Sequence, residues 1–317
     1  MSKHSLPPHW LGRPYYSLDA WFKKEYGGKI YKIALDAGFT CPNRDGTLDS
    51  RGCIFCSTGG SGDFAAKGGS IDEQLRQGLS LFGEKQTGNR FLAYFQAYTN
   101  TYGPLDYLEK IYTEALSHED IVGISIATRP DCLSPEILKL LASLKTRYAS
   151  KIIWVELGLQ TIHEDTALYI RRSYPLSAFD STMTELVNIG IPAVVHLILG
   201  LPGETEEKIL QTIDYVSNLS PFGIKLQLLH ILKGTDLAKE YEAGKIEVLS
   251  KEDYLTLLSK CLTQLSSNIV IHRLTGDGPR ELTLAPLWSL HKRDVLNSLH
   301  KYLKEEDLYQ GKNRRKE

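Results

Sequence analysis

The sequence predicts an α/β fold in which short parallel strands alternate with helices about six times. The predicted strands are apolar throughout rather than alternating, and rich in β-branched and aromatic residues, as is typical of strands covered on both faces. Amphipathic segments separate them, which favours a parallel sheet wound by helices. Six units are too few for a closed eightfold barrel. We therefore expect a partial (β/α)6 parallel barrel, with its chemistry on the loops that follow the strands.

The strand candidates are short apolar runs separated by helical patterns. They are Tyr31–Ala37, Arg90–Ala97, Val122–Thr128, Ile152–Gly158, Ala193–Leu199 and Ile224–Ile231. A further run, Asn268–Leu274, is a candidate for an additional strand beyond the sixth unit.

The helix candidates carry start and stop signals. Ser70 is a predicted N-cap with Glu73 three residues later, and Ser134-Pro135 opens another helix with a cap and a proline in the first turn. The predicted helices are Ile71–Leu81, Leu105–Leu116, Glu136–Tyr148, Leu176–Ile189 and Thr205–Leu219, followed by a helical tail from Pro286.

The composition indicates a globular protein whose positive and negative charges almost balance. Of 317 residues, 37 are Lys or Arg and 38 are Asp or Glu, so the net charge gives no indication of a nucleic-acid partner. No apolar run is long enough to span a bilayer, and the N-terminus lacks an apolar signal segment. We expect a cytoplasmic protein with an N-terminal extension (1–30), the barrel (31–235) and a C-terminal extension (236–317). The basic tail, Lys312–Glu317, is expected to be solvated.

Three of the five cysteines, Cys41, Cys53 and Cys56, crowd into sixteen positions directly after the first predicted strand. Such a cluster in a reducing compartment indicates metal or redox chemistry. Thiolates suit iron–sulfur clusters and zinc alike. Ordinary electron-transfer [4Fe-4S] centres take four cysteines, so three ligands leave one iron open to a substrate or cofactor. The alternative is zinc held by the three thiolates and a histidine such as His4 or His9.

The other polar residues of this loop and the two remaining cysteines have plainer interpretations. Asn43, Asp45-Gly46 and Gly52 supply turns between the first two cysteines. Cys132 and Cys261 are expected to be small buried hydrophobes, although Cys132 is also considered as a fourth ligand.

The cysteine triplet resembles that of the radical S-adenosylmethionine superfamily, in which three cysteines follow the first strand of a partial barrel. Phe55 takes the place of the aromatic residue that commonly precedes the last cysteine. The eleven residues between Cys41 and Cys53 exceed the superfamily's usual spacing, and resemble the branch that contains the Elongator catalytic subunit. Two segments, 36–47 and 94–102, are similar to the YhcC/YtqA-like family. The resemblance implies a [4Fe-4S] cluster and S-adenosylmethionine as cofactors.

Candidate cofactor contacts follow from this resemblance at the ends of successive strands. They are Phe55, Gln96, Thr99, Asn100, Glu156, Gln160, Arg172 and Leu201, with Arg171 as the alternative to Arg172. Glu156 on an apolar strand needs a partner, because an unpaired buried carboxylate is costly. The cofactor ribose is one candidate partner, and Arg129 is another.

The Gram-positive branch of the family implies a function in transfer-RNA wobble-uridine modification, converting a 5-carboxymethylaminomethyl group towards 5-aminomethyl. An electron donor such as flavodoxin or ferredoxin is then required. Basic and aromatic residues suit RNA phosphates and splayed bases. The candidates are Tyr98, Tyr102, Arg129, Arg171 and His230. The tyrosines and Arg171 suit the cofactor pocket or the surface equally well, Arg129 is also the candidate partner of Glu156, and His230 is alternatively a core histidine with its bonds satisfied. Two alternatives stay open: a radical enzyme acting on a small molecule or tetrapyrrole, and a zinc-stabilised binding protein without catalysis.

Overall fold

The structure is a computed structural model that describes residues 6–66, 68–82, 90–276 and 278–314. Seven strands follow one another in the order β1-β2-β3-β4-β5-β6-β8, and a separate two-stranded sheet pairs β7 with β9. The chain divides into two compact units. Unit 1 comprises Met1–Gly28, Gln160–Ala167 and Val195–Glu317, and unit 2 comprises Lys29–Leu159 and Leu168–Val194.

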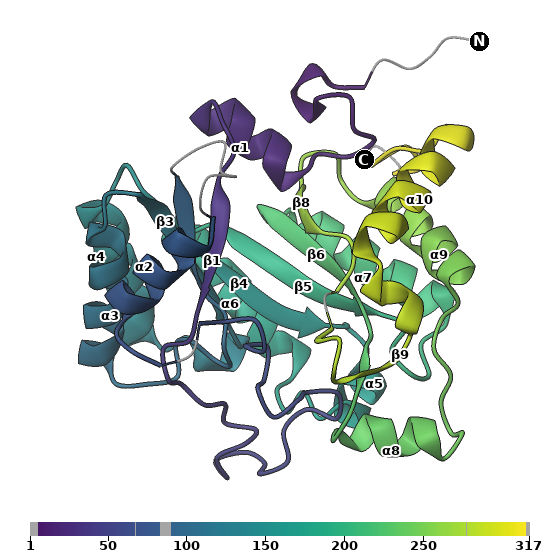
Figure 1. Cartoon of the computed structure of the whole chain (residues 1–317), viewed down its shortest axis with the longest axis horizontal. Coiled ribbons are helices and arrows are strands. Elements are labelled where there is room, and N and C mark those ends of the chain that lie inside the picture. Colours follow the sequence, from purple (N-terminus) through teal and green to yellow (C-terminus); the bar gives the residue numbers. More distant parts are fainter. Residues whose placement is uncertain (1–5, 67, 83–89, 277, 315–317) are drawn as a thin grey trace. The chain divides into compact units, whose positions relative to one another are not determined.

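Unit 2 is built on four parallel strands joined by helices. The strands are β1 (Tyr31–Leu35), β2 (Phe91–Phe95), β3 (Ile121–Thr128) and β4 (Ile152–Gln160), each paired in parallel with the next. The helices are α2 (Ile71–Phe82), α3 (Leu105–Ser117), α4 (Pro135–Arg147) and α6 (Leu176–Asn188), with the short 3-10 helix η3 (Pro130–Cys132) after β3. Figure 1 shows α2, α3 and α4 lined up along one side of β1–β3.

The two faces of these strands differ in chemistry. One row of register-aligned residues, Leu35, Phe95, Ile126 and Val155, is entirely apolar and fully buried. The adjacent row consists of Ala34, Tyr94, Ser125 and Trp154, and points to the opposite face because side chains alternate along a strand. The helices therefore cover an apolar face, and the other face carries polar groups.

Helix starts in unit 2 follow the predicted capping chemistry. Ser70 Oγ accepts a hydrogen bond from the Glu73 amide at 3.2 Å, and the Glu73 carboxylate accepts one from the Ser70 amide at 2.7 Å. This reciprocal arrangement is the predicted capping box. Ser134 is the N-cap of α4, and its Oγ accepts from the amide of Ile137 at 3.4 Å.

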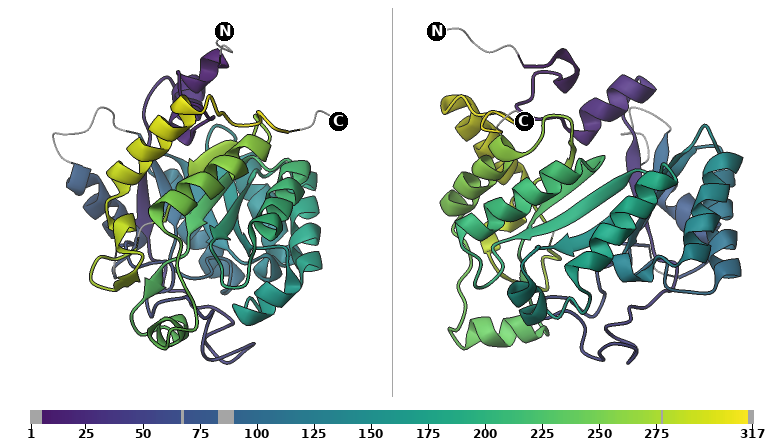
Figure 2. Two further views of the ribbon diagram at one scale, coloured as in Figure 1. Left: turned by 90° about the vertical axis from the view of Figure 1, so that its right-hand side faces the viewer. Right: turned by 180° about the vertical axis from the view of Figure 1, so that it is seen from behind.

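Unit 1 contains the later part of the chain and the N-terminal segment. Its strands include most of β5 (Ala193–Leu199), β6 (Gly223–Leu228), β7 (Ile231–Leu232), β8 (Val270–Arg273) and β9 (Thr283–Ala285). Its helices are η1 (Pro8–Trp10), α1 (Leu18–Tyr26), α7 (Glu206–Leu219), α8 (Asp236–Glu242), α9 (Lys251–Gln264), η4 (Leu287–Leu290) and α10 (Lys292–Glu305). A short helix, α5 (Glu164–Tyr169), crosses the boundary between the units. Figure 2 shows α9 and α10 side by side, and α7 also packs on α9.

Gln310 ties the two ends of the described chain together within unit 1. Its side chain accepts from the Tyr16 amide at 2.9 Å and donates to the carbonyls of Ser266 and Ile269 at 2.6 and 2.9 Å. Beyond it, the Lys312 ammonium bonds the Asp307 carbonyl at 2.6 Å, and Arg314 bonds Asn218 at 3.1 Å. Lys312 and Asn313 are exposed, as expected for a solvated tail, although hydrogen bonds from Lys312 and Arg314 hold the segment on the fold. Residues 315–317 lie outside the described part.

Most predicted elements are confirmed, with one clear break. The predicted strand Ile224–Ile231 ends at Leu228, and Ile231–Leu232 instead pairs antiparallel with β9. At this break the His230 imidazole bonds the Leu228 carbonyl at 3.0 Å. Helices α1, α5, α8 and α9 were not predicted.

Among the described residues, no helix is both long and apolar enough to cross a membrane.

Candidate functional site

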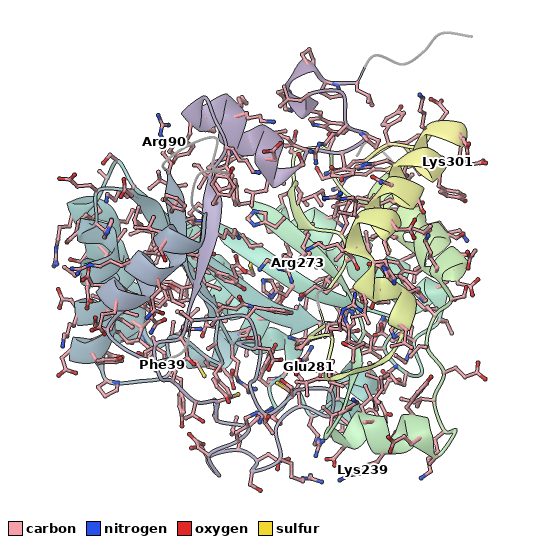
Figure 3. All side chains as sticks on the ribbon, in the orientation of Figure 1. Phe39, Arg90, Lys239, Arg273, Glu281 and Lys301 are labelled. Atoms are coloured by element: carbon pink, nitrogen blue, oxygen red, sulfur yellow. The ribbon has the colours of Figure 1, made fainter. Side chains whose placement is uncertain are left out.

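The loop that carries the three cysteines runs from the end of β1 to the start of α2. Phe39 fixes its beginning, because its ring packs edge-on against Tyr107 of α3 with a centroid distance of 5.7 Å. Figure 3 labels Phe39 where the chain leaves β1. Gly103 lies directly beneath this ring, and a Cβ there would come within 2.6 Å of it. The loop is therefore anchored at the carboxyl end of β1, where a parallel α/β sheet places its functional groups.

Backbone hydrogen bonds fold the cysteine loop into a compact series of turns. The Cys41 carbonyl accepts from the amide of Arg44 at 2.7 Å, and the Cys53 carbonyl accepts from the amide of Cys56 at 3.0 Å. The Asn43 carbonyl accepts from the amide of Gly52 at 2.7 Å. Gly52 has a φ of 77°, so a left-handed conformation is required there, as its turn assignment predicted.

Arg44 holds the segment around the third cysteine. Its guanidinium donates to the carbonyls of Cys56 at 2.9 Å and Ser57 at 2.5 Å, and lies 5.8 Å from the ring centre of Tyr98. The Tyr98 hydroxyl in turn donates to the Thr58 carbonyl at 2.5 Å. Tyr98, predicted as a substrate residue, is therefore part of the loop's support. Tyr102 has a comparable role, since its hydroxyl bonds Thr47 at 2.8 Å.

A second segment, residues 170–172, packs its backbone carbonyls against the cysteine loop. The Ile54 amide donates to the Ile170 carbonyl at 3.2 Å, and the Asn43 side-chain amide donates to the Arg171 carbonyl at 2.7 Å. The Cys53 thiol also points to the Arg171 carbonyl, at 3.6 Å. Arg171 itself has a left-handed backbone with a φ of 57°.

The three thiols interact electrostatically with one another. Burial raises the pKa of Cys53 to about 12, and the charges of Cys56 and Cys41 add to this, while Arg129 and Asn43 act in the opposite direction. Burial also raises the pKa of Cys56, opposed by the Arg44 guanidinium. Buried thiols that repel one another as anions become thiolates when a cationic centre binds them. The donor set therefore fits an iron–sulfur cluster, in which each thiolate binds its own iron. Among the described residues, no three His, Cys, Asp or Glu side chains are arranged to hold a single metal ion.

Two buried asparagines, one inside the cysteine loop and one just after β2, keep an acceptor oxygen without a partner among the described residues. They are Asn43 and Asn100, both fully buried. The Asn100 amide nitrogen donates to the Ala127 carbonyl at 3.0 Å, and its neighbour Thr99 donates its backbone amide to Thr40, directly before Cys41, at 3.3 Å. An unpaired buried oxygen costs about 1–3 kcal/mol. Both oxygens fit a ligand that carries N–H donors, as the amino group of S-adenosylmethionine does.

Gln96 and Phe55 lie in the same unit but have different surroundings. The Gln96 side chain donates to the Ser61 carbonyl at 2.6 Å, and Ser61 Oγ donates back to the Gln96 carbonyl at 2.7 Å. Gln96 therefore ties the cysteine loop to the end of β2. Phe55 is half-buried in the turn between Cys53 and Cys56.

Two arginines converge on Tyr174 next to the cysteine loop. The guanidinium carbons of Arg129 and Arg172 lie 5.0 and 4.8 Å from the centre of its ring. Arg172 is 1% exposed and donates to the carbonyls of Tyr174 at 3.0 Å and Leu159 at 3.3 Å. These bonds fix the backbone after β4 relative to the segment that contacts Cys53.

Glu156 has a protein partner that was not expected. It is 0% exposed and accepts from Lys32 of β1 at 3.2 Å and from Ser125 of β3 at 2.6 Å. The alternative that paired it with Arg129 is wrong, because Arg129 forms a two-point ion pair with Asp131 at 2.9 and 2.7 Å. Sequence spacing does not reveal Lys32, which lies 124 positions away.

The two lone cysteines behave differently. Cys261 is fully buried in α9, as predicted. The prediction of a buried hydrophobe is wrong for Cys132, which is half-buried in η3. Burial and the Asp131 carboxylate raise the pKa of Cys132 to about 12, and the charge of Cys41 contributes as well.

The remaining candidates, Gln160, Leu201 and His230, belong to unit 1. Leu201 is buried after β5, and Gln160 ends β4 with a φ of 64°. His230 bonds the Leu228 carbonyl and the Ser289 hydroxyl, each at 3.0 Å. Gly276 packs against the same ring, since a Cβ there would lie 2.5 Å from it.

Comparison with known proteins identifies the family. A family model described as the Radical SAM superfamily matches residues 50–216, more than half of the chain, and one described as a Radical_SAM C-terminal domain matches residues 221–305. The chain is 42% identical over 315 residues to the protein YtqA of Bacillus subtilis, covering 98% of this chain and 96% of that protein. It is 38% identical to the protein YhcC of Escherichia coli, covering 89% and 90%.

A solved structure shows the same fold. The Elp3 protein of the archaeon Methanocaldococcus infernus, with its N-terminus deleted, superposes with a TM-score of 0.67 at 15% identity. The match covers 89% of this chain and 64% of that one. This likeness and the strand order confirm the predicted α/β radical-enzyme fold. Enzymes of this superfamily use a [4Fe-4S] cluster and S-adenosylmethionine. The chain belongs to the radical S-adenosylmethionine superfamily of enzymes.

Proposed function

We propose that Cys41, Cys53 and Cys56 hold a [4Fe-4S] cluster and that the enzyme modifies the 5-substituent of a transfer-RNA wobble uridine. The observation that carries the cluster assignment is the anchored loop itself, in which backbone turns fold the segment that holds the three cysteines after β1 and the buried Asn43 amide nitrogen lies 3.6 Å from the Cys53 sulfur. When bound, the cluster and S-adenosylmethionine supply a 5′-deoxyadenosyl radical for hydrogen abstraction.

The residues of unit 2 have distinct roles in this proposal. The three cysteines bind iron, and Asn100 accepts a hydrogen bond from the amino group of S-adenosylmethionine through its buried oxygen. Arg172 positions the backbone beside Cys53 through its bonds to Leu159 and Tyr174. Further cofactor contacts are proposed at Phe55, Gln96, Thr99, Gln160 and Leu201, while Glu156 holds Lys32 in place.

The transfer-RNA substrate is proposed from the family resemblance of segments 36–47 and 94–102. The conversion of a 5-carboxymethylaminomethyl group towards 5-aminomethyl would take place at the cysteine loop. Tyr98, Tyr102, Arg129, Arg171 and His230 are the proposed substrate-side residues. A flavodoxin or ferredoxin is proposed as electron donor, and the cytoplasm as the site of action.

The substrate assignment is tested with purified, cluster-loaded enzyme and transfer RNA that carries 5-carboxymethylaminomethyluridine. Nucleoside mass spectrometry is expected to show loss of this nucleoside and gain of the 5-aminomethyl form, and neither change with Cys53→Ala. Unchanged transfer RNA with continued cleavage of S-adenosylmethionine would favour the small-molecule or tetrapyrrole alternative. Zinc without iron or sulfide in the purified protein would favour the non-catalytic alternative.

A further inference from the structure

The loop between Cys41 and Cys53 folds back so that the side chain of one of its residues, Asn43, contacts Cys53. The Asn43 side chain is fully buried, and its amide nitrogen lies 3.6 Å from the Cys53 sulfur. The same nitrogen donates to the Arg171 carbonyl at 2.7 Å and faces the Arg172 carbonyl at 3.5 Å. This contact involves an atom that the proposed function assigns to iron binding.

The surroundings of Asn43 determine which way its amide points. An amide nitrogen has two hydrogens and no acceptor capacity, whereas the amide oxygen only accepts. Two carbonyl oxygens and a sulfur, all acceptors, surround the nitrogen, and the oxygen has no partner among the described residues. A flipped amide would place its oxygen against these acceptors. One N–H therefore goes to Arg171, and the second faces the Arg172 carbonyl and the Cys53 sulfur.

Cluster binding strengthens the contact to sulfur. The Cys53 thiol points its own hydrogen at the Arg171 carbonyl at 3.6 Å. Once Cys53 is an iron-bound thiolate, it has no hydrogen to donate and carries negative charge. Hydrogen bonds to charged acceptors are shorter and about twice as strong as those between neutral groups. The second N–H of Asn43 then prefers sulfur over the more weakly accepting Arg172 carbonyl.

We propose that the Asn43 side-chain amide donates an N–H···S hydrogen bond to the Cys53 ligand and thereby raises the reduction potential of the cluster. This proposal rests on the proposed iron ligation by Cys53. Hydrogen bonds to the sulfurs and outer-shell partners tune the potentials of iron–sulfur clusters. The direction follows from charge, because the reduced cluster carries one more electron and gains more from a nearby donor.

The proposal also gives the long cysteine spacing a physical role. Residues 42–52 bring consecutive side chains to two different cysteines, since Asn43 faces the Cys53 sulfur and Arg44 bonds the Cys56 carbonyl. Asn43 is thus a positioning and tuning residue, distinct from the ligands.

The test is a redox titration of the reconstituted cluster, followed by electron paramagnetic resonance of its reduced form. Asn43→Leu keeps the size of the side chain and removes the donor, and Arg51→Ala in the same loop is the matched control, because Arg51 is exposed and pairs with Asp49. Asn43→Leu is expected to lower the reduced-to-oxidised ratio tenfold at a fixed potential, about 59 mV for one electron. Arg51→Ala is expected to match the unchanged enzyme. Full iron content with an unchanged potential in Asn43→Leu would overturn the proposal.

A second measurement decides the matter if Asn43→Leu loses its cluster. Unchanged enzyme labelled with side-chain 15N-asparagine is reduced, and pulsed electron paramagnetic resonance is used to detect a coupling between the cluster and an amide nitrogen. The coupling is expected, and its absence in the loaded enzyme would overturn the proposal. A cluster retained by Cys53→Ala would instead contradict the proposed function, so the two failures are distinguishable.

Discussion

Two groups of buried polar side chains in unit 2 differ in how completely the protein satisfies them. On the polar face of the strands, the Glu156 carboxylate has both an ammonium and a hydroxyl as partners. In the cysteine loop and in the segment bonded to it, Asn43 and Asn100 each keep a carbonyl oxygen without a partner among the described residues. In the first group, the protein itself supplies the hydrogen-bond partners of the buried carboxylate. The second group keeps acceptor capacity that the described residues do not use, which supports the proposal that a ligand binds at the loop.

The surroundings of Lys32 strengthen this contrast. Its ammonium is bonded to Glu156 and lies 5.1 Å from the ring centre of Tyr94 and 5.6 Å from that of Trp154. Aromatic faces stabilise a cation in addition to the ion pair. We therefore expect the Lys32–Glu156 pair to contribute to the stability of the fold. Substitutions there should lower the free energy of unfolding more than they weaken cofactor binding.

The largest expected effect breaks the cysteine loop. Cys53→Ala is expected to abolish cluster binding, because two thiolates cannot hold the cluster in a loop built for three. Iron and sulfide analysis with visible absorption after anaerobic reconstitution measures this. Cys132→Ala is the matched control, being half-buried in the same unit. It is expected to keep the cluster, and loss of the cluster in Cys132→Ala would make it the fourth ligand.

The second-largest effect is expected from breaking the Lys32–Glu156 ion pair. Glu156→Ala leaves the Lys32 ammonium, 24% exposed, without its carboxylate. Removing one partner of a buried ion pair costs about 3–5 kcal/mol, and partial exposure of Lys32 places the expected loss near the lower end. Urea denaturation followed by circular dichroism measures the free energy of unfolding.

A double-mutant cycle sharpens this prediction. Lys32→Met combined with Glu156→Ala should recover part of the loss, because no buried charge then lacks its partner. Strictly additive losses would show that the two groups do not stabilise each other.

A smaller effect concerns the unmatched oxygen of Asn100. Asn100→Ala is expected to weaken binding of S-adenosylmethionine about tenfold, or about 1.4 kcal/mol, by removing one acceptor of a buried hydrogen bond. Calorimetry on the cluster-loaded enzyme measures the dissociation constant. Asn313→Ala, in the C-terminal segment of unit 1, should bind as the unchanged enzyme does. Equal affinities of the unchanged enzyme, Asn100→Ala and Asn313→Ala for S-adenosylmethionine would show that Asn100 does not contact the cofactor.

The smallest effect lies at the exposed rim of the cysteine loop. The Arg51 guanidinium and the local backbone amides lower the pKa of Asp49 from 3.8 to about 2. A lowered carboxyl pKa contributes stability that is present above the unfolded value and lost as pH falls through the folded value. Arg51→Ala should therefore raise the Asp49 pKa and reduce the pH dependence of stability between about pH 4 and 2. Carboxyl titration by nuclear magnetic resonance measures the shift, and an unchanged pKa would contradict it.

The strands and most helices of unit 2 were predictable because their signals are local. Continuous apolar runs mark the strands, and the Ser70–Glu73 capping box marks the start of α2. Helix α9 also carried a usable signal. Its buried residues Tyr254, Leu257, Leu258, Cys261 and Leu262 follow the spacing of one helix face, after an N-cap at Ser250.

The site contacts were less predictable because they join distant parts of the chain. Asn43 looks like an ordinary turn residue in the sequence, and its burial depends on a segment 128 positions later. The Lys32–Glu156 pair spans a similar separation. Cysteine positions are visible in a sequence, but the neighbours that tune them are decided by which strand ends the fold brings together.

The central claim is that the cysteine loop is the site of radical chemistry, and cofactor cleavage tests it most directly. Reconstituted enzyme is incubated anaerobically with S-adenosylmethionine and dithionite, and 5′-deoxyadenosine is measured by chromatography. We predict its formation by the unchanged enzyme and by Cys132→Ala, and its loss in Cys41→Ala, Cys53→Ala and Cys56→Ala. Cleavage retained by any of these last three variants would contradict the account.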